Sequence, residues 1–188
     1  MNSVALITGA AGGVGQALAR RLAADGWQLV VVSRDAARLE AAFGNAHLQV
    51  VADCSTPAGV AQIFAEAAAA GLTPSALAHC VGNIRLGALH RTKEQDFRDC
   101  LEANLISAFH TLAGFVGALA KAGQPGAAVL VSSAAARIGT PNHEAVAAAK
   151  AGVEGLVRGA AATYAGAGIR INAVAPGIME TPAAARII

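Results

Sequence analysis

The chain has 188 residues, with 55% hydrophobic but only 4% aromatic side chains, and a formal net charge of +2 at pH 7. This length suits a single domain, residues 1–188, and the small side chains predict close packing of helices on a sheet. The weak charge gives no basic field for nucleic acid, and Gly, Pro or charged residues interrupt the apolar runs before the roughly 18 residues of a membrane span. With no signal-peptide pattern, we expect a cytoplasmic protein that binds neither nucleic acid nor membrane.

An apolar run near the N-terminus, Val4 to Thr8, predicts a buried strand, and the helical spacing of Gln16 to Ala24 predicts a helix soon after it. The segment between them is rich in glycine: Gly9, Gly12, Gly13 and Gly15. Glycines let the backbone approach a bound anion, and the first N–H groups and the dipole of the helix favour phosphate there. The strand, turn and helix therefore predict a site for a dinucleotide pyrophosphate.

A second apolar run, Gln28 to Val32, ends at Ser33 and Arg34, where a nucleotide-binding unit faces the adenosine ribose. An acidic residue there accepts hydrogen bonds from a 2′-hydroxyl, whereas an arginine pairs with a 2′-phosphate. Because Arg34 follows the strand directly, NADP is favoured over NAD. The alternative is that Arg34 is a solvated surface charge, and Asp35 is expected to cap a helix from Ala36 to Phe43.

Two further strands are predicted, His47 to Val51 and Ser75 to Val81, with an alanine-rich helix from Ala58 to Ala70 between them. Asp53 follows the first of these strands, where it can contact the cofactor, cap the next helix, or do both. His79 is interpreted as a strand residue near the cofactor and not as a catalytic base, since nothing nearby is expected to orient it.

Thr92 and Gln95 form a predicted capping box for a long helix that runs to about Ala120. Asn104 lies at the edge of the apolar stripe of this helix, where a polar amide needs a hydrogen-bond partner. The remaining elements are a fifth strand, a helix and a sixth strand: Gly126 to Ser132, His143 to Gly166 and Ile169 to Val174.

Strand and helix alternate throughout, which calls for right-handed crossovers and a parallel sheet. We therefore predict an α/β fold of the Rossmann type, a doubly wound sheet of strand order 3-2-1-4-5-6 with helices on both faces. A ligand is expected over the carboxyl ends of the strands, at the switch between strands 1 and 4.

The turn residues Thr8, Gly9, Gly13, Val14 and Gly15 form the pattern T-G-x-x-x-G-x-G, which resembles the cofactor turn of the short-chain dehydrogenase/reductase family. Further residues fall in the order of that family: Asp53, Asn104, Ser133, Lys150, Pro176, Gly177 and Thr181. The resemblance covers essentially the whole chain. It implies an oxidoreductase that transfers a hydride between NADP(H) and a small carbonyl or alcohol substrate.

The resemblance also implies how the cofactor is held. It places Asp53 near the adenine amino group and the P-G-x-x-x-T segment near the nicotinamide carboxamide. At the end of the fourth strand the N-N-A-G of the family is replaced by H-C-V-G, in which only Gly82 matches. We expect Cys54 and Cys80, which lie close to Asp53 and Gly82 in the sequence, to line the cofactor site as well.

In the family, a serine and a tyrosine hydrogen-bond the substrate oxygen, and a lysine four residues after the tyrosine holds the ribose and lowers the pKa of the tyrosine. Ser133 and Lys150 occupy the serine and lysine positions, and Asn104 occupies that of an asparagine which shapes a helix kink and a proton-relay water. Four residues before Lys150 stands Val146, which has no proton to give. The only tyrosine, Tyr164, lies roughly 27 Å further along the helix.

His143 precedes Val146 by three residues and Lys150 by seven, which puts the three on one helical stripe. Its imidazole is therefore a candidate general acid, and a better one than Glu144. The alternative is that Asn142 or His143 only caps the helix. Should no group supply the proton, the chain is instead an NADP(H)-binding sensor or the silent partner subunit of an active homologue.

The printed chain stops soon after Thr181, so we expect neither substrate-covering helices nor a seventh strand. Either the sequence is incomplete, or the protein lacks a substrate lid and its reaction centre is open to water. The long apolar-faced helices Thr92 to Ala120 and His143 to Gly166 predict a homodimer or homotetramer, with ordinary packing on the sheet as the alternative. The three cysteines, Cys54, Cys80 and Cys100, lack the paired spacing of a zinc site. We expect reduced thiols and no metal.

Overall fold

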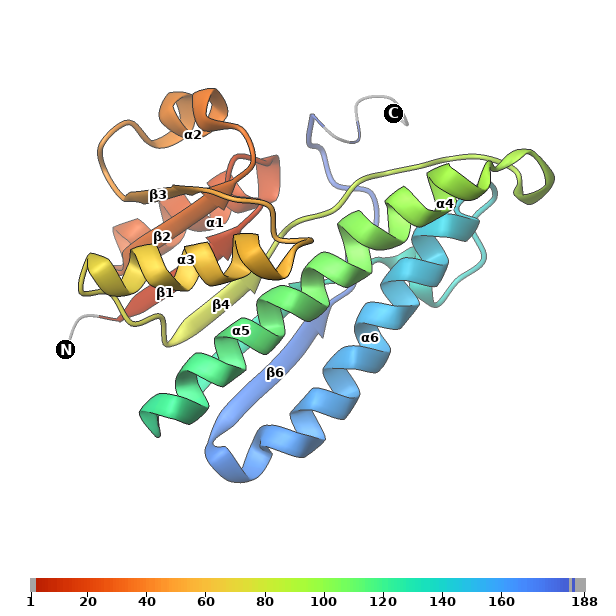
Figure 1. Ribbon diagram of the computed structural model, residues 1–188. Coiled ribbons are helices and arrows are strands. Elements are labelled where there is room, and N and C mark those ends of the chain that lie inside the picture. Colours follow the sequence, from red (N-terminus) through yellow and green to blue (C-terminus); the bar gives the residue numbers. More distant parts are fainter. Residues whose placement is uncertain (1–2, 183, 185–188) are drawn as a thin grey trace.

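The central element of the fold is one parallel sheet whose strands lie in the order β3-β2-β1-β4-β5-β6 (Figure 1). The computed structural model describes residues 3–182 and residue 184. In chain order the strands are β1 Val4–Thr8, β2 Gln28–Ser33, β3 Leu48–Val51, β4 Ala76–His79, β5 Gly126–Val131 and β6 Ile169–Val174. The predicted Rossmann-type fold and strand order are confirmed. Strands β1 and β4 pair with each other in parallel, and the direction in which successive strands are added to the sheet reverses between them. In a sheet of this kind the reversal leaves a crevice at the carboxyl ends of the two strands.

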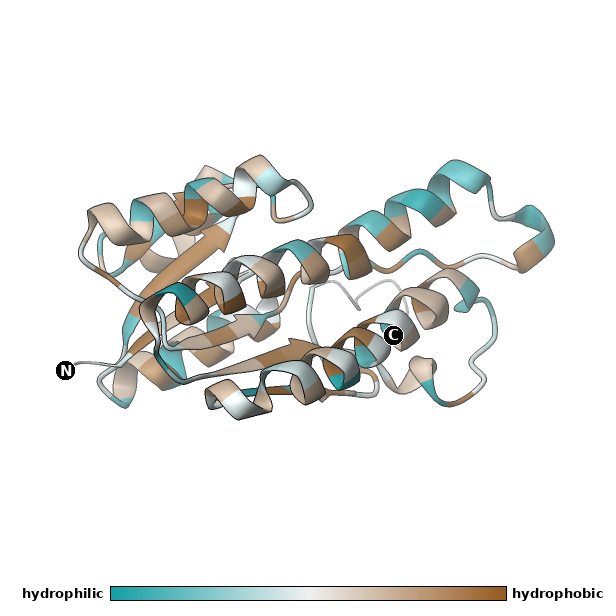
Figure 2. Ribbon diagram, turned by 60° about the horizontal axis from the view of Figure 1, so that its bottom comes forward, coloured by the Kyte–Doolittle hydropathy of each residue, from teal (hydrophilic) through white to brown (hydrophobic). Residues whose placement is uncertain are grey.

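Helices cover both faces of the sheet. They are α1 Gly13–Ala24, α2 Ala36–Phe43, α3 Pro57–Ala69, α4 Glu94–Leu101, α5 Ser107–Ala122 and α6 Glu144–Tyr164. Figure 1 shows α3, α5 and α6 in front of the sheet, and α1 and α2 pack on the other face. Figure 2 shows hydrophilic residues gathered on α4, where the chain extends beyond the sheet.

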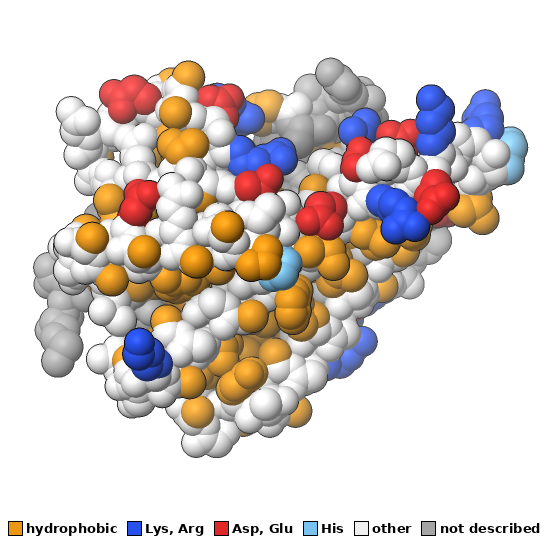
Figure 3. All heavy atoms as spheres, viewed as in Figure 1, with side chains coloured by type: hydrophobic (Ala, Val, Ile, Leu, Met, Phe, Trp, Pro, Cys, Tyr) orange, Lys and Arg blue, Asp and Glu red, His pale blue; other side chains and the backbone are white. Residues whose placement is uncertain are grey.

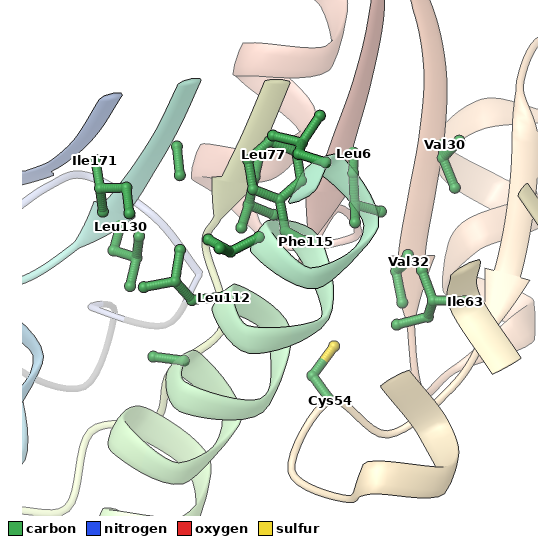
Figure 4. Packing of buried hydrophobic residues seen from close by; sticks show 14 of the residues in the cluster. Leu6, Val30, Val32, Cys54, Ile63, Leu77, Leu112, Phe115, Leu130 and Ile171 are labelled. Atoms are coloured by element: carbon green, nitrogen blue, oxygen red, sulfur yellow. The ribbon is translucent and has the colours of Figure 1, made fainter. Parts of the chain in front are cut away.

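Each face of the sheet has its own core, because alternate strand residues point to opposite sides. In the front core, Phe115 of α5 packs with Leu6, Leu77 and Leu130 of three strands (Figure 4). In the rear core, Ile7 and Val31 pack against α1 and α2. The central strand β1 is buried along its whole length, which explains why it reads as an unbroken apolar run.

The caps of two helices differ from what the sequence suggested. For Asp53 the helix cap was one of two open alternatives, and Thr56 caps α3 instead, since the Thr56 hydroxyl accepts a hydrogen bond from the N–H of Gly59 at 3.0 Å. The predicted capping box of Thr92 and Gln95 does not form. Helix α4 begins one residue too late for it, so the Thr92 hydroxyl instead donates back to the carbonyl of Ala88 at 3.1 Å.

Helices α4 and α5 are joined by a π-helical segment, Glu102–Ile106, into one run from Glu94 to Ala122. By length and composition this run is apolar enough to cross a membrane, which the sequence analysis had not expected of any segment. Several of its large apolar residues, however, belong to the core of the sheet: Leu112, Phe115 and Leu119 are buried there. A core helix passes the same test of length and composition, and burial explains its character here.

Candidate functional site

The turn between β1 and α1 brings bare backbone to the carboxyl edge of the sheet. Gly9 has a φ of 69°, and a Cβ on it would lie 2.7 Å from the carbonyl carbon of Cys80, so only glycine fits against the end of β4. Gly12 is the N-cap of α1 and has no side chain that could hydrogen-bond to the first N–H groups of the helix. The first turn of α1 lies within the described residues and contains no acidic residue. Its N–H groups and the helix dipole are therefore free to bind an anion.

The remaining residues of the glycine motif, Gly13, Val14 and Gly15, belong to the first turn of α1 and pack against neighbouring segments. A Cβ on Gly15 would lie 2.5 Å from the carbonyl oxygen of Gly9, so this glycine lets α1 approach the turn closely. A Cβ on Gly13 would lie 2.9 Å from Cγ2 of Thr181. The segment after β6 therefore folds back over the start of α1. Val14, between the two glycines, is half-buried in the first turn of the helix.

Polar residues follow β2 and β3 beside this turn. Asp35 caps α2 as predicted, accepting a hydrogen bond from the Arg38 N–H at 3.0 Å, while Ser33 accepts one from the Asp35 N–H at 3.2 Å. Arg34 is largely exposed and lies 3.8 Å from Asp53. Burial opposes ionisation of the Asp53 carboxyl, but hydrogen bonds from Ser55 and the charge of Arg34 hold its pKa below the usual value.

Arg38 also belongs to this region, although no motif in the sequence points to it. Its guanidinium Nη2 donates to the carbonyl oxygen of Ala11 at 2.9 Å, and Nε2 of Gln16 donates to the same oxygen at 3.0 Å. Arg34 and Arg38 thus place two guanidinium groups around the glycine turn and the end of β2. Two cations beside an adenosine ribose favour a ligand with a 2′-phosphate.

A cleft of about 520 Å³ opens over these elements. Seven of the predicted cofactor residues line it: Gly9, Ser33, Arg34, Asp53, Cys54, Cys80 and Gly82. Burial raises the pKa of the Cys54 and Cys80 thiols to about 11, so both side chains line the cleft as uncharged thiols at pH 7. The other predicted cofactor residues are not among those that line the cleft: Thr8, Gly13, Val14, Gly15, Lys150, Pro176, Gly177 and Thr181.

His79 lies in the floor beneath the cleft, and the expectation that nothing orients it is wrong. Its Nδ1 is 2.8 Å from Oγ1 of Thr8, and its Nε2 is 3.2 Å from Oγ of Ser107. Burial, with a smaller effect of the nearby Lys150 charge, lowers the pKa of His79 to about 3. The imidazole is therefore neutral and links β1, β4 and α5.

Lys150 and Asn104 meet behind Gly82. A Cβ on Gly82 would lie 2.7 Å from Oδ1 of Asn104 and 3.3 Å from Nζ of Lys150. Nζ donates to the carbonyl oxygen of Val131 at 2.8 Å. The amide of Asn104 donates to Oδ1 of Asn83 at 2.8 Å and to the carbonyl of Cys100 at 2.9 Å, which supplies the partners that its buried position needs. Asn104 lies inside the π-helical segment, so the expected distortion of the helix is present.

Ser133 is the second residue after β5, and its hydroxyl accepts a hydrogen bond from the N–H of Ala135 at 3.2 Å. Its neighbour Ser132 points to α6, within 3.1 Å of Glu154 and 3.2 Å of the Lys150 carbonyl oxygen. The side chain of Glu154 is only 8% exposed, and Arg137 donates to it from Nε at 2.9 Å. Burial opposes ionisation of Glu154, but hydrogen bonds from Arg137 and Ser132 hold its pKa below the usual value.

This buried carboxylate was not found from the sequence, because its partners come from a different element. It ties the segment that carries Ser133 to the helix that carries Lys150. Pro176 lies beside the same segment, since its carbonyl accepts from the N–H of Ala134 at 2.8 Å. The carboxyl ends of β5 and β6 thus meet next to α6.

Val146 and His143 lie further toward the start of α6. Val146 is buried in a small apolar cluster with Cys100 and Phe97 of α4. His143 is the N-cap residue of α6, but its side chain caps nothing there; its Nδ1 lies 2.8 Å from the carbonyl oxygen of Pro141. His143 does not line the cleft, and seven residues of helix rise, about 10 Å, separate it from Lys150.

A parallel sheet with a glycine turn between β1 and α1, and with polar residues at the carboxyl ends of β2 to β6, defines a dinucleotide-binding α/β protein. Comparison with known families agrees. The family model for short chain dehydrogenases matches residues 3–188, so the chain belongs to the short-chain dehydrogenase family of oxidoreductases.

Two curated relatives show how far the similarity extends. The chain is 37% identical over 185 residues to cis-4-hydroxycyclohexanecarboxylate dehydrogenase of Sinomonas cyclohexanicum, covering 95% of this chain and 74% of the relative. It is 31% identical over 195 residues to (3R)-3-hydroxyacyl-CoA dehydrogenase of Canis lupus familiaris, covering 96% of this chain and 75% of the relative.

Solved structures share the fold. An oxidoreductase of the short chain dehydrogenase/reductase family from Burkholderia thailandensis matches with a TM-score of 0.88 and 33% identity, covering 100% of this chain and 73% of that one. ElxO, solved with NADP bound, matches with a TM-score of 0.89 and 27% identity, and the match covers 97% of this chain and 76% of the ElxO chain.

Proposed function

We propose that the protein is an oxidoreductase that transfers a hydride between NADP(H) and a small carbonyl or alcohol substrate. The observation that carries this proposal is the pair of guanidinium groups, Arg34 and Arg38, at the edge of the cleft that begins at the glycine turn. The uncapped start of α1 fits a pyrophosphate, and the two arginines fit a 2′-phosphate. The NADP bound to the related ElxO supports the same cofactor.

The residues in and around the cleft would have separate roles in binding the cofactor and the substrate. The turn from Gly9 and the first N–H groups of α1 would hold the pyrophosphate, and Lys150 would contact the ribose at the nicotinamide end. When bound, the reduced nicotinamide supplies the hydride. The Ser133 hydroxyl, at the end of β5, would donate a hydrogen bond to the substrate oxygen and stabilise the negative charge that develops there.

The rival is a protein that binds NADP(H) without turnover, as a sensor or as the partner subunit of an active homologue. It is favoured by Val146, which stands one helical turn before Lys150 and packs in an apolar cluster instead of presenting a hydroxyl. The two functions share the cofactor site and differ only in whether a carbonyl is reduced.

One pair of measurements separates them. Calorimetric titration with NADPH and NADH is expected to show tighter binding of NADPH, and a panel of small carbonyls at fixed NADPH is expected to show loss of NADPH absorbance. Binding with no NADPH oxidation by any carbonyl supports the sensor. No affinity for either nucleotide contradicts both functions.

We further propose that two copies pair through α5 and α6. Figure 3 shows apolar side chains spread over the face formed by α3, α5 and α6, and Phe109 of α5 is 48% exposed. Exposed apolar area of this kind is typical of a subunit interface. Light scattering is expected to give a dimer or tetramer, and Phe109→Asp is expected to shift it toward the monomer. A wild-type monomer at all accessible concentrations contradicts the proposal.

A further inference from the structure

The proton needed for carbonyl reduction has an unused source in this site, the ammonium group of Lys150. Lys150 is 7% exposed, and its Nζ lies directly behind Gly82, which lines the cleft. The same Nζ is bonded to the carbonyl of Val131, two residues before Ser133. The amine therefore lies between the carboxyl ends of β4 and β5, behind the part of the cleft wall that Gly82 forms.

Lys150 keeps protons available in this position. An ammonium group has three N–H donors, and the described contacts use one of them on Val131. The described contacts include no hydrogen bond from Nζ to the neighbouring Asn104, whose Oδ1 accepts from the N–H of Asn83 at 3.3 Å. A substrate oxygen or a cofactor hydroxyl in the cleft could accept the others.

The surroundings also make the amine a usable acid near neutral pH. Burial lowers the pKa of Lys150 to about 8, and only the ionised thiolates of Cys100 and Cys80 would act in the opposite direction. The titratable groups that face Nζ come from two elements: Cys100 from α4, and Cys80 with His79 from the end of β4. None carries a charge at pH 7, because burial raises the pKa of both thiols and lowers that of the imidazole.

We propose that Lys150 is the general acid of this enzyme and donates a proton from Nζ to the substrate oxygen. This role rests on the proposed oxidoreductase function and adds to the contact of Lys150 with the cofactor ribose. A reduced nicotinamide, when bound, would supply the hydride to the carbonyl carbon and would itself be oxidised. As the C=O π pair moves to the oxygen, Nζ of Lys150 gives that oxygen its proton, so that the carbonyl becomes an alcohol. The neutral amine then regains a proton from solvent.

The structure favours Lys150 over the other candidates. Val146 has no proton, and its side chain is turned into the cluster with Phe97 and Cys100. His143 lies at the start of α6, about 10 Å of helix rise from Lys150, with Nδ1 on the carbonyl of Pro141. Nζ of Lys150, in contrast, lies directly behind Gly82, which lines the cleft. A single side chain would thus serve both as the cofactor contact and as the acid.

Lys150→Arg separates these two tasks, because a guanidinium keeps the positive charge but does not release a proton near neutral pH. We expect the dissociation constant for NADPH to change by less than about threefold and kcat for carbonyl reduction to fall by about 100-fold or more. The wild-type kcat is expected to fall as the pH rises through about 8, since the protonated amine is the acid, and Lys150→Arg is expected to lose this inflection. Lys121→Arg, the same change at an exposed site, is the matched control.

A second readout needs neither cofactor nor turnover. The chain has three lysines, Lys93, Lys121 and Lys150, so a protein labelled with ¹³C-lysine gives three side-chain signals that can be titrated by NMR. One signal is expected to titrate near pH 8 and to disappear in Lys150→Arg. A Lys150 signal that titrates together with the two other lysines overturns the proposal.

The kinetic outcomes distinguish this inference from the function on which it rests. Turnover that survives Lys150→Arg but is lost in His143→Gln overturns the role of Lys150 and leaves the oxidoreductase standing. A wild-type protein that binds NADPH but oxidises none of it, with any carbonyl, overturns both. Loss of NADPH affinity in Lys150→Arg, with kcat at saturation unchanged, assigns the lysine to cofactor binding alone and also overturns the acid role.

Discussion

The guanidinium of Arg38 donates a hydrogen bond to the carbonyl oxygen of Ala11 at 2.9 Å, across 27 residues of sequence. This contact places a cation from α2 over the glycine turn, beside Arg34 from the end of β2. The contact also engages the carbonyl oxygen of Ala11, so that fewer free carbonyl oxygens of the glycine turn would repel a bound phosphate. We therefore expect selectivity for a phosphorylated ribose to depend on the end of β2 and the start of α2, which only the fold brings together.

Arg38→Gln is expected to weaken NADPH binding by about tenfold, or about 1.4 kcal/mol, because a charge-assisted contact with the 2′-phosphate is lost. NADH lacks that phosphate, so its affinity is expected to change by less than about twofold. Titration calorimetry of both nucleotides measures the two effects. Arg20→Gln, an exposed arginine on α1, is the control. Equal weakening of NADPH and NADH would mean that Arg38 acts on the turn and not on the phosphate.

Gly15→Ala is expected to destabilise the protein by about 2 kcal/mol or more, since the added Cβ would lie 2.5 Å from the carbonyl oxygen of Gly9 and 2.6 Å from Cα of Ala10. Gly159→Ala, also in a helix, meets nothing within 4 Å and is expected to stabilise by about 0.5–1 kcal/mol. Urea unfolding of both variants checks this. Similar free energies of unfolding for the two would show that the turn can move aside.

Much of the fold was predictable because its central strands are buried on both faces. An unbroken apolar run such as Val4 to Thr8, followed by glycines, has few other interpretations, and the strand order follows from the alternation of strand and helix. Local rules did less well at helix starts, where a shift of one residue removes Thr92 from the capping position. The π-helical segment around Asn104 carries no local signal in residue type beyond the asparagine itself.

The parts of the site that were missed depend on contacts between distant residues. Thr8 and His79 are 71 residues apart, and Ser132 and Glu154 are 22 apart on different elements. A histidine in a strand or a glutamate in a helix looks the same in the sequence whether it is solvated or buried with partners. Only the pairing of β1 with β4, and the packing of α6 on β5, decides between these two cases.

Arg137→Met is expected to destabilise the protein by about 1–3 kcal/mol, because it leaves the buried Glu154 carboxylate without its nearest cation. Arg158, at 3.8 Å, compensates only in part. A double-mutant cycle with Glu154→Gln, followed by urea unfolding, measures the coupling between the two side chains. Arg170→Met, an exposed arginine on β6, is the control. Strictly additive effects of the two changes would show that the pair contributes nothing to stability.

His79 is expected to make the folded state sensitive to acid. Its pKa is about 3 in the folded protein and 6.5 when unperturbed, so between these values the unfolded chain binds more protons than the folded one. This contribution to stability is complete above pH 6.5 and is lost as the pH falls toward 3, with a slope of at most about 1.4 kcal/mol per pH unit.

His79→Asn tests this directly, because asparagine keeps a polar side chain near Thr8 but does not titrate. The free energy of unfolding, measured by urea at several pH values from about 7 to 4, is expected to fall less steeply in this variant than in the wild type. Carboxylates titrate in the same range, but they are unchanged in the variant, so the difference between the two curves isolates the histidine. His90→Asn, at an exposed site, is expected to reproduce the wild-type slope. Parallel curves for His79→Asn and the wild type would mean that His79 can be protonated while the chain stays folded.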